Sequence, residues 1–429
     1  MADEYVIGVD AGTGSVRAGL FDLQGNLIAH ASRDIRIWNP REKFFQQSSQ
    51  DIWSRVCHTV KSTLEESGVS PDSVIGISYD ATCSLVALDA NDEPISVSPD
   101  GETEQNIVVW MDHRAEGQAE RINATGEEVL KYVGGKLSPE QEPPKLLWLK
   151  ENLLDSWKKT DKFLDLTDFL TYKSTGIDDR SVCTTACKWT YLAHETRWDA
   201  EFFETIDLPE LLEEQKIGDT INPPGQLIGT LTDEAAADLG LTTQTKVATG
   251  IIDAHAGAIG VLGLEFESKP DPAELEEVLA LIGGTSSCHL AVSREPKFIP
   301  GVWGPYYDAL LPDMWLTEGG QSTSGSLVDY MIKENSRHDD IKKQAEQNNQ
   351  SVYDFLNSRV ETMRRKEPVG PEIVRDMHML PYFLGNRSPI ADPSLKGVIT
   401  GLVLDDSIDT VAKRYYARSE ERRVGKECA

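Results

Sequence analysis

The chain has 429 residues, of which 39% are hydrophobic and 26% charged, a composition typical of globular proteins. This length exceeds what one hydrophobic core usually serves, so we expect two domains. Acidic residues outnumber basic ones by 71 to 42, and the net charge of −29 disfavours nucleic acid and anionic membranes as partners. Any bound phosphate must be held by local amides, a few cationic side chains or a metal ion.

The N-terminal segment "MADEYVIGVD" has no basic stretch followed by an apolar one, and no run of 18 apolar residues occurs. We therefore expect a cytoplasmic protein with reduced thiols. Its six cysteines show no disulfide framework. Cys183 and Cys187 form a C-x3-C pair, but no second pair or nearby histidine completes a zinc site. The oligomeric state is not readable from the sequence.

The first part of the chain combines strands with one helix. Apolar β-type segments and turn residues predict three opening strands, over residues 5–10, 15–22 and 27–38. A helix is predicted next, with Ser49 as its N-cap and Gly68 as its stop. Two more strands are expected over residues 73–80 and 84–89. This order favours an α/β or α+β fold rather than βαβ units from the first residue.

The pattern changes beyond this region. Residues 113–245 predict mostly helices, and residues 246–263 predict a strand, a turn and a helix. The acidic segment 265–280 is expected to be a surface insertion. After it, "LALIGGTSSCHLAVS", residues 279–293, repeats the strand–Gly/Thr–strand pattern of "VIGVDAGTGSV", residues 6–16. The repeat suggests two related halves.

Gly12 and Gly14 lie between two predicted strands, whereas the usual glycine-rich phosphate loop leads into a helix. One interpretation is a plain hairpin in which glycine supplies a positive φ. The other is a turn that presents successive N–H groups to a phosphate, with Thr13 and Ser15 beside them. Asp10 would then face the accompanying metal. Spacing alone leaves both interpretations open.

The segment "GVDAGTGSVRAGLFD" resembles the first phosphate motif of the sugar kinase, Hsp70 and actin superfamily. Within it, the chain resembles the FGGY carbohydrate kinases, especially their ribulokinase-like members. The segments that support this resemblance occur in the family's order: "SYDATCSLVALD", "WMDHRA", "TTACKWTY", "GIIDAHAGAIG", "GGTSSC", "EGGQSTSG" and "GNRSPIADPSLKGVITGL". The resemblance implies an α/β protein with two ribonuclease H-like domains that bind sugar and ATP in the cleft between them.

The resemblance makes Asp253 the general base, which takes the proton of a sugar hydroxyl as that oxygen attacks the γ-phosphoryl group. From the residues alone, Asp253 is better explained as a cap for the helix that follows it, and the two roles can coexist. His255 is expected to pack or to support the site rather than to catalyse.

The resemblance also implies a set of sugar-contacting residues: Thr82, Cys83, Asp112, Arg114, Lys188 and Glu318. Carboxylates, lysine and backbone groups suit a substrate with many hydroxyls. Asp112 and Arg114 have an alternative as a surface ion pair. Trp110 and Trp189 are placed equally well against a sugar face or in the core.

Two groups are expected to hold the phosphates of ATP: Gly12, Thr13, Gly14 and Ser15 from the first domain, and Gly284, Thr285, Ser286 and Gln321 from the second. Fixed amides around a transferring phosphoryl group need no reorganisation during the reaction. Mg²⁺ would bridge the phosphates and reach Asp10, through water. The run from Gly319 to Gly325 has the alternative of a plain helix-capping loop.

The implied domains are residues 1–257 for sugar, 258–416 for nucleotide, and a charged tail, 417–429, without a core pattern. The family's Gly-Gly turn for adenosine has no counterpart, so we expect a truncated second domain and a tail that is not native. ADP release by this chain and by a completed one tests that expectation. The predicted activity is phosphorylation of a ketopentose, D-ribulose first, with L-ribulose, xylulose or a polyol as other substrates. Its alternatives are a non-catalytic actin- or Hsp70-like nucleotide-binding protein and an inactive pseudokinase.

Overall fold

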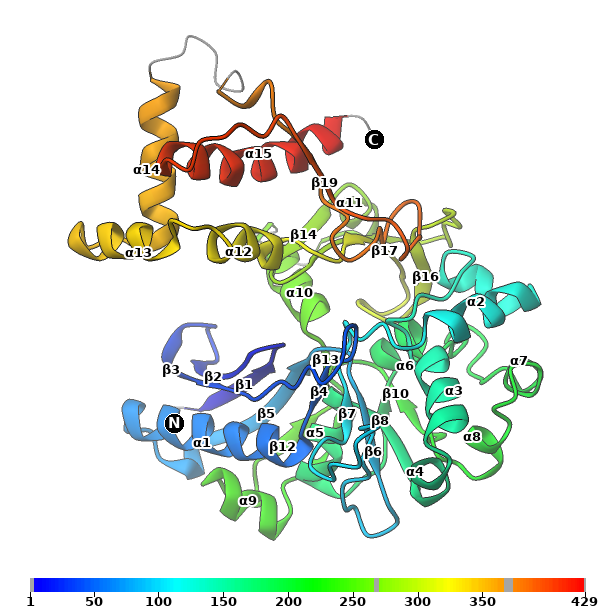
Figure 1. Ribbon diagram of the computed structural model, residues 1–429. Helices are drawn as coiled ribbons and strands as arrows, with labels where there is room; N and C mark the ends of the chain where they lie inside the picture. The colour runs from blue at the N-terminus through cyan, green and yellow to red at the C-terminus, as the bar shows by residue number, and fades with distance from the viewer. Residues whose placement is uncertain (1–3, 266–269, 366–372, 428–429) are drawn as a thin grey trace. The chain divides into compact units, whose positions relative to one another are not determined.

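The computed structural model describes residues 4–265, 270–365 and 373–427 (Figure 1). The chain forms two compact units. Unit 1 comprises Met1–Ile282 and His289–Gly319, and unit 2 comprises Gly283–Cys288 and Gly320–Ala429. The predicted division after residue 257 concerns family domains rather than compact units, and it stays a prediction. Among the described residues, no helix is both long and apolar enough to cross a membrane.

The main sheet of unit 1 has seven strands in the order β11-β12-β5-β1-β2-β3, with β13 paired to β5. Their bounds are β1 (Tyr5–Ala11), β2 (Ser15–Asp22), β3 (Leu27–Asp34), β5 (Val74–Ala81), β11 (Leu227–Thr230), β12 (Lys246–Ala248) and β13 (Ile251–Ile252). The first three strands are antiparallel, while β5 is parallel to β1 and β12 is parallel to β5. This is the strand order of a ribonuclease H-like core, as the resemblance implied.

The two faces of this sheet differ. Alternate residues of β1, Ile7, Val9 and Ala11, belong to one core with residues of helices α1 (Ser49–Ser67), α5 (Leu166–Thr175) and α9 (Asp233–Leu239). Figure 1 shows α1 and α9 along this side of the sheet. Because side chains alternate along a strand, Asp10 points to the opposite face. The helices therefore leave the other face of the sheet for polar groups.

The predicted strands and the first helix are confirmed, with two corrections: β3 ends at Asp34 rather than at residue 38, and the cap of the helix differs. Ser48, not Ser49, caps α1, because its hydroxyl accepts the N–H of Asp51, 3.2 Å away. Gly68 ends the helix in the left-handed conformation, as predicted.

The other elements of unit 1 surround this core. A second sheet has the order β4-β7-β6-β8, and β9 pairs with β10. The bounds are β4 (Gln46–Gln47), β6 (Leu85–Leu88), β7 (Ile107–Val108), β8 (Lys162–Asp165), β9 (Arg180–Ser181), β10 (Ile221–Asn222) and β16 (Trp303–Tyr307). The helices are α2 (Glu116–Thr125), α3 (Glu142–Asn152), α4 (Leu154–Lys159), α6 (Val182–Lys188), α7 (Ala200–Thr205), α8 (Glu210–Glu213), α10 (Asp253–Glu265) and α11 (Pro272–Leu275). The helix-rich middle region is thus confirmed, while residues 266–269 of the expected acidic insertion lie outside the described residues.

Three strands contain residues of both units: β14 (Leu279–Gly283), β15 (Ser287–Ser293) and β17 (Trp315–Gln321). In its described residues, unit 2 adds four α-helices and a β18–β19 pair. Their bounds are α12 (Gly325–Lys333), α13 (His338–Gln347), α14 (Val352–Arg364), α15 (Ile408–Glu427), β18 (His378–Leu380) and β19 (Val398–Thr400). Most of the predicted tail belongs to α15, and residues 428–429 lie outside the described residues.

Candidate active site

Three carboxylates meet at the carboxyl ends of three adjacent strands. Asp10 of β1 lies opposite Asp80 of β5 in the parallel register, and Asp80 lies opposite Ile251 of β13. Asp253 follows β13 directly as the first residue of α10. Strand order therefore gathers residues that are more than 240 positions apart in the sequence. The sequence prediction missed Asp80, although its place at the end of a strand before Thr82 was a usable signal.

The carboxylates disfavour one another's charge. Burial, followed by the charges of Asp10 and Asp253, raises the pKa of Asp80 well above its usual value. Burial also raises the pKa of Asp10, although Arg17 opposes this from 2.9 Å. Burial raises the pKa of Asp253 to about 6, with a smaller contribution from Asp10. Such a group is ionised at neutral pH but remains a proton acceptor of useful strength.

One oxygen of Asp253 accepts the N–H of Ala254, the next residue, at 2.6 Å. Asp253 is the first residue of α10, and a helix cap would instead accept an N–H two or three residues further on. Oδ1 of Asp10 is buried, and no described residue donates a hydrogen bond to it. A buried carboxylate oxygen of this kind, beside a second carboxylate, has the chemistry that Mg²⁺ requires.

The glycine turn between β1 and β2 is a hairpin without positive φ at Gly12 or Gly14. Neither position therefore requires glycine for its ability to adopt a positive φ. Gly12 donates its N–H to Ser15 O at 3.0 Å, while no described residue accepts from the N–H of Thr13 or Gly14. A Cβ added at Gly14 would meet no atom within 4 Å. The turn thus leaves open space and two N–H groups, which favours the phosphate interpretation.

Trp110 and Gln47 hold this turn in place. The indole Nε1 of Trp110 donates to the Thr13 hydroxyl at 3.0 Å, and the Gln47 amide donates to the Thr13 carbonyl at 2.8 Å. Trp110 and Trp189 are both buried, at 7% and 3% exposure, so the core alternative fits them better than stacking on a sugar.

The turn Gly284–Thr285–Ser286 in unit 2 also has N–H groups without an acceptor among the described residues, like the turn between β1 and β2. Gly284 donates to Ser286 O at 2.8 Å, and no described residue accepts from the N–H of Thr285 or Ser286. The first turn of α12 packs on it, since a Cβ on Gly325 would lie 2.6 Å from Gly284 O. Gln321 lies at the end of β17, four residues before this helix.

Three other predicted sugar residues, Lys188, Glu318 and Thr82, lie in unit 1. Lys188, the last residue of α6, lies with Nζ 4.4 Å from the centre of the Trp303 ring. Trp303 lies opposite Glu318 across β16 and β17, so Lys188 and Glu318 share a neighbour. Thr82 donates its N–H to Ala11 O at 3.1 Å, at the end of the strands that carry Asp10 and Asp80.

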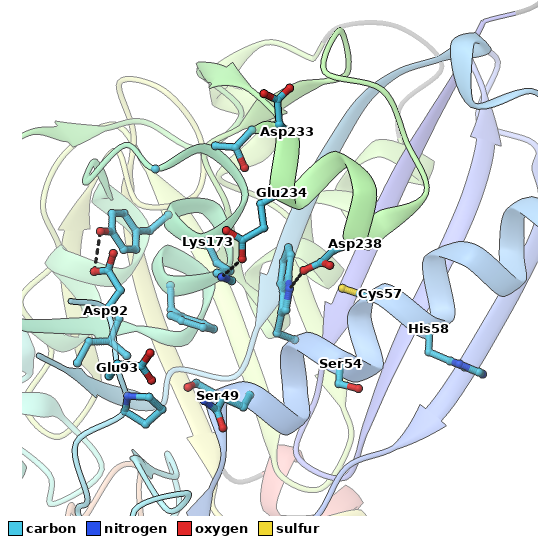
Figure 2. A pocket seen from close by; sticks show the side chains of 18 of the residues that line it. Ser49, Ser54, Cys57, His58, Asp92, Glu93, Lys173, Asp233, Glu234 and Asp238 are labelled. Atoms are coloured by element: carbon cyan, nitrogen blue, oxygen red, sulfur yellow. Dashed lines mark hydrogen bonds and ion pairs between the residues drawn. The ribbon is translucent and has the colours of Figure 1, made fainter.

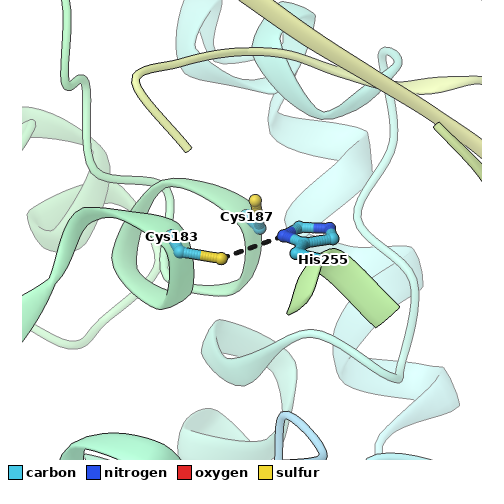
Figure 3. Close-up of side chains that lie close together, drawn as sticks. All are labelled: Cys183, Cys187 and His255. Atoms are coloured by element: carbon cyan, nitrogen blue, oxygen red, sulfur yellow. Dashed lines mark hydrogen bonds between the residues drawn. The ribbon is translucent and has the colours of Figure 1, made fainter. Parts of the chain in front are cut away.

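His255 contacts both Glu318 and Cys183, and neither contact was predicted from the sequence. Its Nε2 lies 3.2 Å from Glu318 Oε2, and its Nδ1 lies 2.9 Å from Cys183 Sγ (Figure 3). Burial opposes the charge on His255, but Cys183 and Glu318 raise its pKa to about 10. Burial likewise opposes the Cys183 thiolate, yet Cys187 and His255 lower its pKa to about 5. The expectation that no histidine accompanies these cysteines is wrong, because the fold brings His255 from 72 positions away.

Asp112 and Arg114 form a buried ion pair, with both side chains 0% exposed. Asp112 accepts from the Arg114 guanidinium at 2.7 and 2.9 Å, and from the Phe45 N–H at 2.7 Å. The guanidinium also lies 4.4 Å and 5.0 Å from the ring centres of Phe44 and Trp148. The alternative interpretation correctly pairs Asp112 with Arg114 but is wrong to place the pair on the surface. This geometry favours a structural role over the predicted sugar contact.

The adjacent His113 is also buried, with Glu116 at 3.5 Å and Glu140 at 3.4 Å. Burial opposes its charge, but these carboxylates raise its pKa to about 9. The stabilisation from the imidazolium is therefore complete below the unfolded pKa of about 6.5 and is lost as the pH rises through about 9.

Substituting His113→Gln is expected to lower the free energy of unfolding by up to about 3 kcal/mol near pH 6. The difference from the unmodified chain should shrink steadily between pH 7 and pH 10. Urea unfolding at a series of pH values measures this difference. A difference independent of pH would contradict a charged His113.

A wide cavity of about 990 Å³ lies elsewhere on unit 1, beside α1, α5 and α9 (Figure 2). Its lining includes several carboxylates, but none of the predicted site residues. Lys173 pairs with Glu234 at 2.9 Å, and Asp238 accepts from the Trp53 indole at 2.9 Å. The three strand-end carboxylates, rather than this cavity, thus mark the candidate active site.

Comparison with known proteins agrees with this fold. Residues 5–260 match the N-terminal domain of the FGGY family of carbohydrate kinases, and residues 279–418 match its C-terminal domain. The chain therefore belongs to the FGGY family of carbohydrate kinases.

Two relatives are similar over almost the whole chain. The FGGY carbohydrate kinase domain-containing protein of Homo sapiens is 45% identical over 99% of this chain and 77% of its own length. A D-ribulokinase of Saccharomyces cerevisiae is 40% identical over 97% of this chain and 62% of its own length. The gluconate kinase structure from Lactobacillus acidophilus shares the fold, with a TM-score of 0.73 and 20% identity over 98% of this chain and 76% of that one.

Proposed function

We propose that the protein transfers the γ-phosphoryl group of ATP to a ketopentose, with D-ribulose as the best-supported substrate. The observation that carries the proposal is Asp253, a partly buried carboxylate with a raised pKa beside Asp10 and Asp80. The substrate class follows from the 40% identity to a D-ribulokinase over 97% of this chain. Family membership favours catalysis over the non-catalytic alternative.

In the proposed reaction, a sugar hydroxyl lies against Asp253. Its oxygen forms a bond to the γ-phosphorus, its proton moves to the Asp253 carboxylate, and the bond from the γ-phosphorus to the bridging oxygen breaks to release ADP. Lys188 and Glu318 would orient the sugar through hydrogen bonds to its hydroxyl groups, as the family resemblance implies. Thr82 and Cys83 would add contacts at the end of β5.

The N–H groups of Thr13 and Gly14 would hold phosphate oxygens, and those of Thr285 and Ser286 form a second candidate anion site in unit 2. Mg²⁺ fits the orphaned Oδ1 of Asp10, reached directly or through water. When bound, it would neutralise phosphate charge. The protein's own contribution is to hold the sugar oxygen and the carboxylate at hydrogen-bond distance.

A panel of D-ribulose, L-ribulose, D-xylulose and polyols, with ADP release as the readout, tests the substrate. Pentuloses differ by the stereochemistry of one hydroxyl, so kcat/KM for each must be compared. We expect D-ribulose to give the highest kcat/KM. A clear preference for another sugar would contradict the substrate, and the absence of ADP release with every sugar would contradict the proposed function.

Substituting Gly14→Val should weaken ATP binding by about 10- to 100-fold, because the side chain would fill the space where a phosphate would approach two N–H groups. The fold should tolerate the change, since nothing lies within 4 Å of that Cβ. Gly117→Val is the matched control, because Gly117 is also exposed, with no atom within 4 Å of an added Cβ. Calorimetric titration with ATP measures the effect. Unchanged affinity in Gly14→Val would show that this turn does not bind phosphate.

A further inference from the structure

Cys183, Cys187 and His255 form a closed cluster of potential metal ligands. The two cysteines are four positions apart on α6, so their side chains lie on the same side of the helix. His255 faces them from the first turn of α10 (Figure 3). The two cysteine sulfur atoms and one ring nitrogen of His255 all lie within 4.8 Å of one another. All three residues are buried, with exposures of 0%, 0% and 1%.

We propose that these three residues bind a thiophilic divalent cation, and that Zn²⁺ is the ion their chemistry fits. Two thiolates with one imidazole are a ligand set that zinc enzymes use, with a fourth position left for water or another small ligand. Two thiolate charges balance the divalent cation, so the metal and its three ligands are neutral together. Neutrality matters because an uncompensated charge in such a buried place is costly.

The distance between the Cys183 and His255 ligand atoms needs only a small adjustment. Zn–S bonds of about 2.3 Å and Zn–N bonds of about 2.0 Å place tetrahedral ligand atoms about 3.5 Å apart. Cys183 Sγ and His255 Nδ1 are 2.9 Å apart, so they would separate by roughly half an ångström. Rotation of the cysteine side chains is enough for such a change.

Glu318 supplies a second, independent argument. Its carboxylate accepts from Nε2 of His255 at 3.2 Å, which leaves Nδ1 directed at the sulfur atoms. A carboxylate behind a metal-binding histidine fixes the ring and strengthens it as a ligand. Cys187 also directly precedes Lys188. If the proposed function holds, the metal site would therefore adjoin two sugar-binding residues, but metal binding itself does not depend on that function.

The test is a titration of the reduced, metal-free chain with Zn²⁺ in competition with a chromophoric chelator. We expect about one Zn²⁺ per chain, and Co²⁺ in its place should give the thiolate charge-transfer absorption of a tetrahedral site. Cys183→Ser and Cys187→Ser should each weaken binding at least about 100-fold, while Glu318→Gln should weaken it about 10- to 100-fold. Cys57→Ser is the control, because Cys57 lies on α1, outside the cluster. Equal affinity in the cluster variants and in Cys57→Ser would overturn the proposal.

A second measurement avoids variants that fail to fold. In the unmodified chain, the X-ray absorption of bound Zn²⁺ should show about two sulfur neighbours at about 2.3 Å and one nitrogen neighbour at about 2.0 Å. A set of neighbours without sulfur would overturn the proposal. Neither readout uses kinase activity, so failure of the metal site is distinguishable from failure of the proposed function.

Discussion

Substituting Asp253→Asn is expected to lower kcat by about 10²- to 10⁴-fold and to leave the sugar's KM nearly unchanged. An amide keeps the shape of the carboxylate but cannot take the proton of the attacking hydroxyl. The loss corresponds to roughly 3–5 kcal/mol of barrier. ADP release with D-ribulose measures kcat and KM together.

The same substitution should make the chain more stable. Burial raises the pKa of Asp253 to about 6, so the fold disfavours the ionised carboxylate. That cost is absent below the unfolded pKa of about 3.9 and is fully present above about pH 6. At pH 8, Asp253→Asn should therefore raise the free energy of unfolding by about 1–3 kcal/mol. Lost activity together with gained stability separates the loss of a base from misfolding.

The pH profile gives a further measurement. Because the base must be deprotonated, kcat/KM of the unmodified chain should rise with pH through about 6 and then level off. Asp233→Asn is the control, since Asp233 lines the wide cavity rather than the strand ends. Asp253→Asn with normal turnover, or Asp233→Asn with a similar loss, would contradict the assignment of the base.

The sequence predicted those parts of the site that depend on short segments. The alternation of apolar residues before Asp10, with glycines after it, located the first hairpin, and the second strand–turn–strand segment was found by its likeness to the first. Asp253 and Lys188 were located by their motifs alone. Such features are local, because strand and turn preferences extend over a few residues.

The rest depends on register and tertiary packing. Asp80 lies beside Asp10 only because β5 pairs with β1 in parallel, and His255 meets Cys183 only because α10 faces α6. A pattern within a short sequence segment does not identify such distant neighbours. The positive-φ interpretation of Gly14 failed for a different reason, because the residue adopts no unusual φ and the open space beside it is what a side chain would remove.

The buried pair of Asp112 and Arg114 gives the second large prediction. Asp112→Asn should lower the free energy of unfolding by about 3–5 kcal/mol, because the Arg114 guanidinium would remain buried without a compensating charge. That is a large share of the 5–15 kcal/mol by which domains are usually stable. Urea unfolding of this chain measures the change. The folded fraction should keep its KM for the sugar, since the pair is 0% exposed.

Two further variants make this prediction specific. The double substitution Asp112→Asn with Arg114→Met should cost less than Asp112→Asn alone, because it removes the unpaired charge and keeps an apolar side chain against Phe44 and Trp148. Arg41→Ala breaks an exposed pair, with side chains 53% and 53% exposed, and should change stability by less than about 1 kcal/mol. If Asp112→Asn instead raised the sugar's KM with stability unchanged, the ion pair would belong to the sugar site, and its structural role would be wrong.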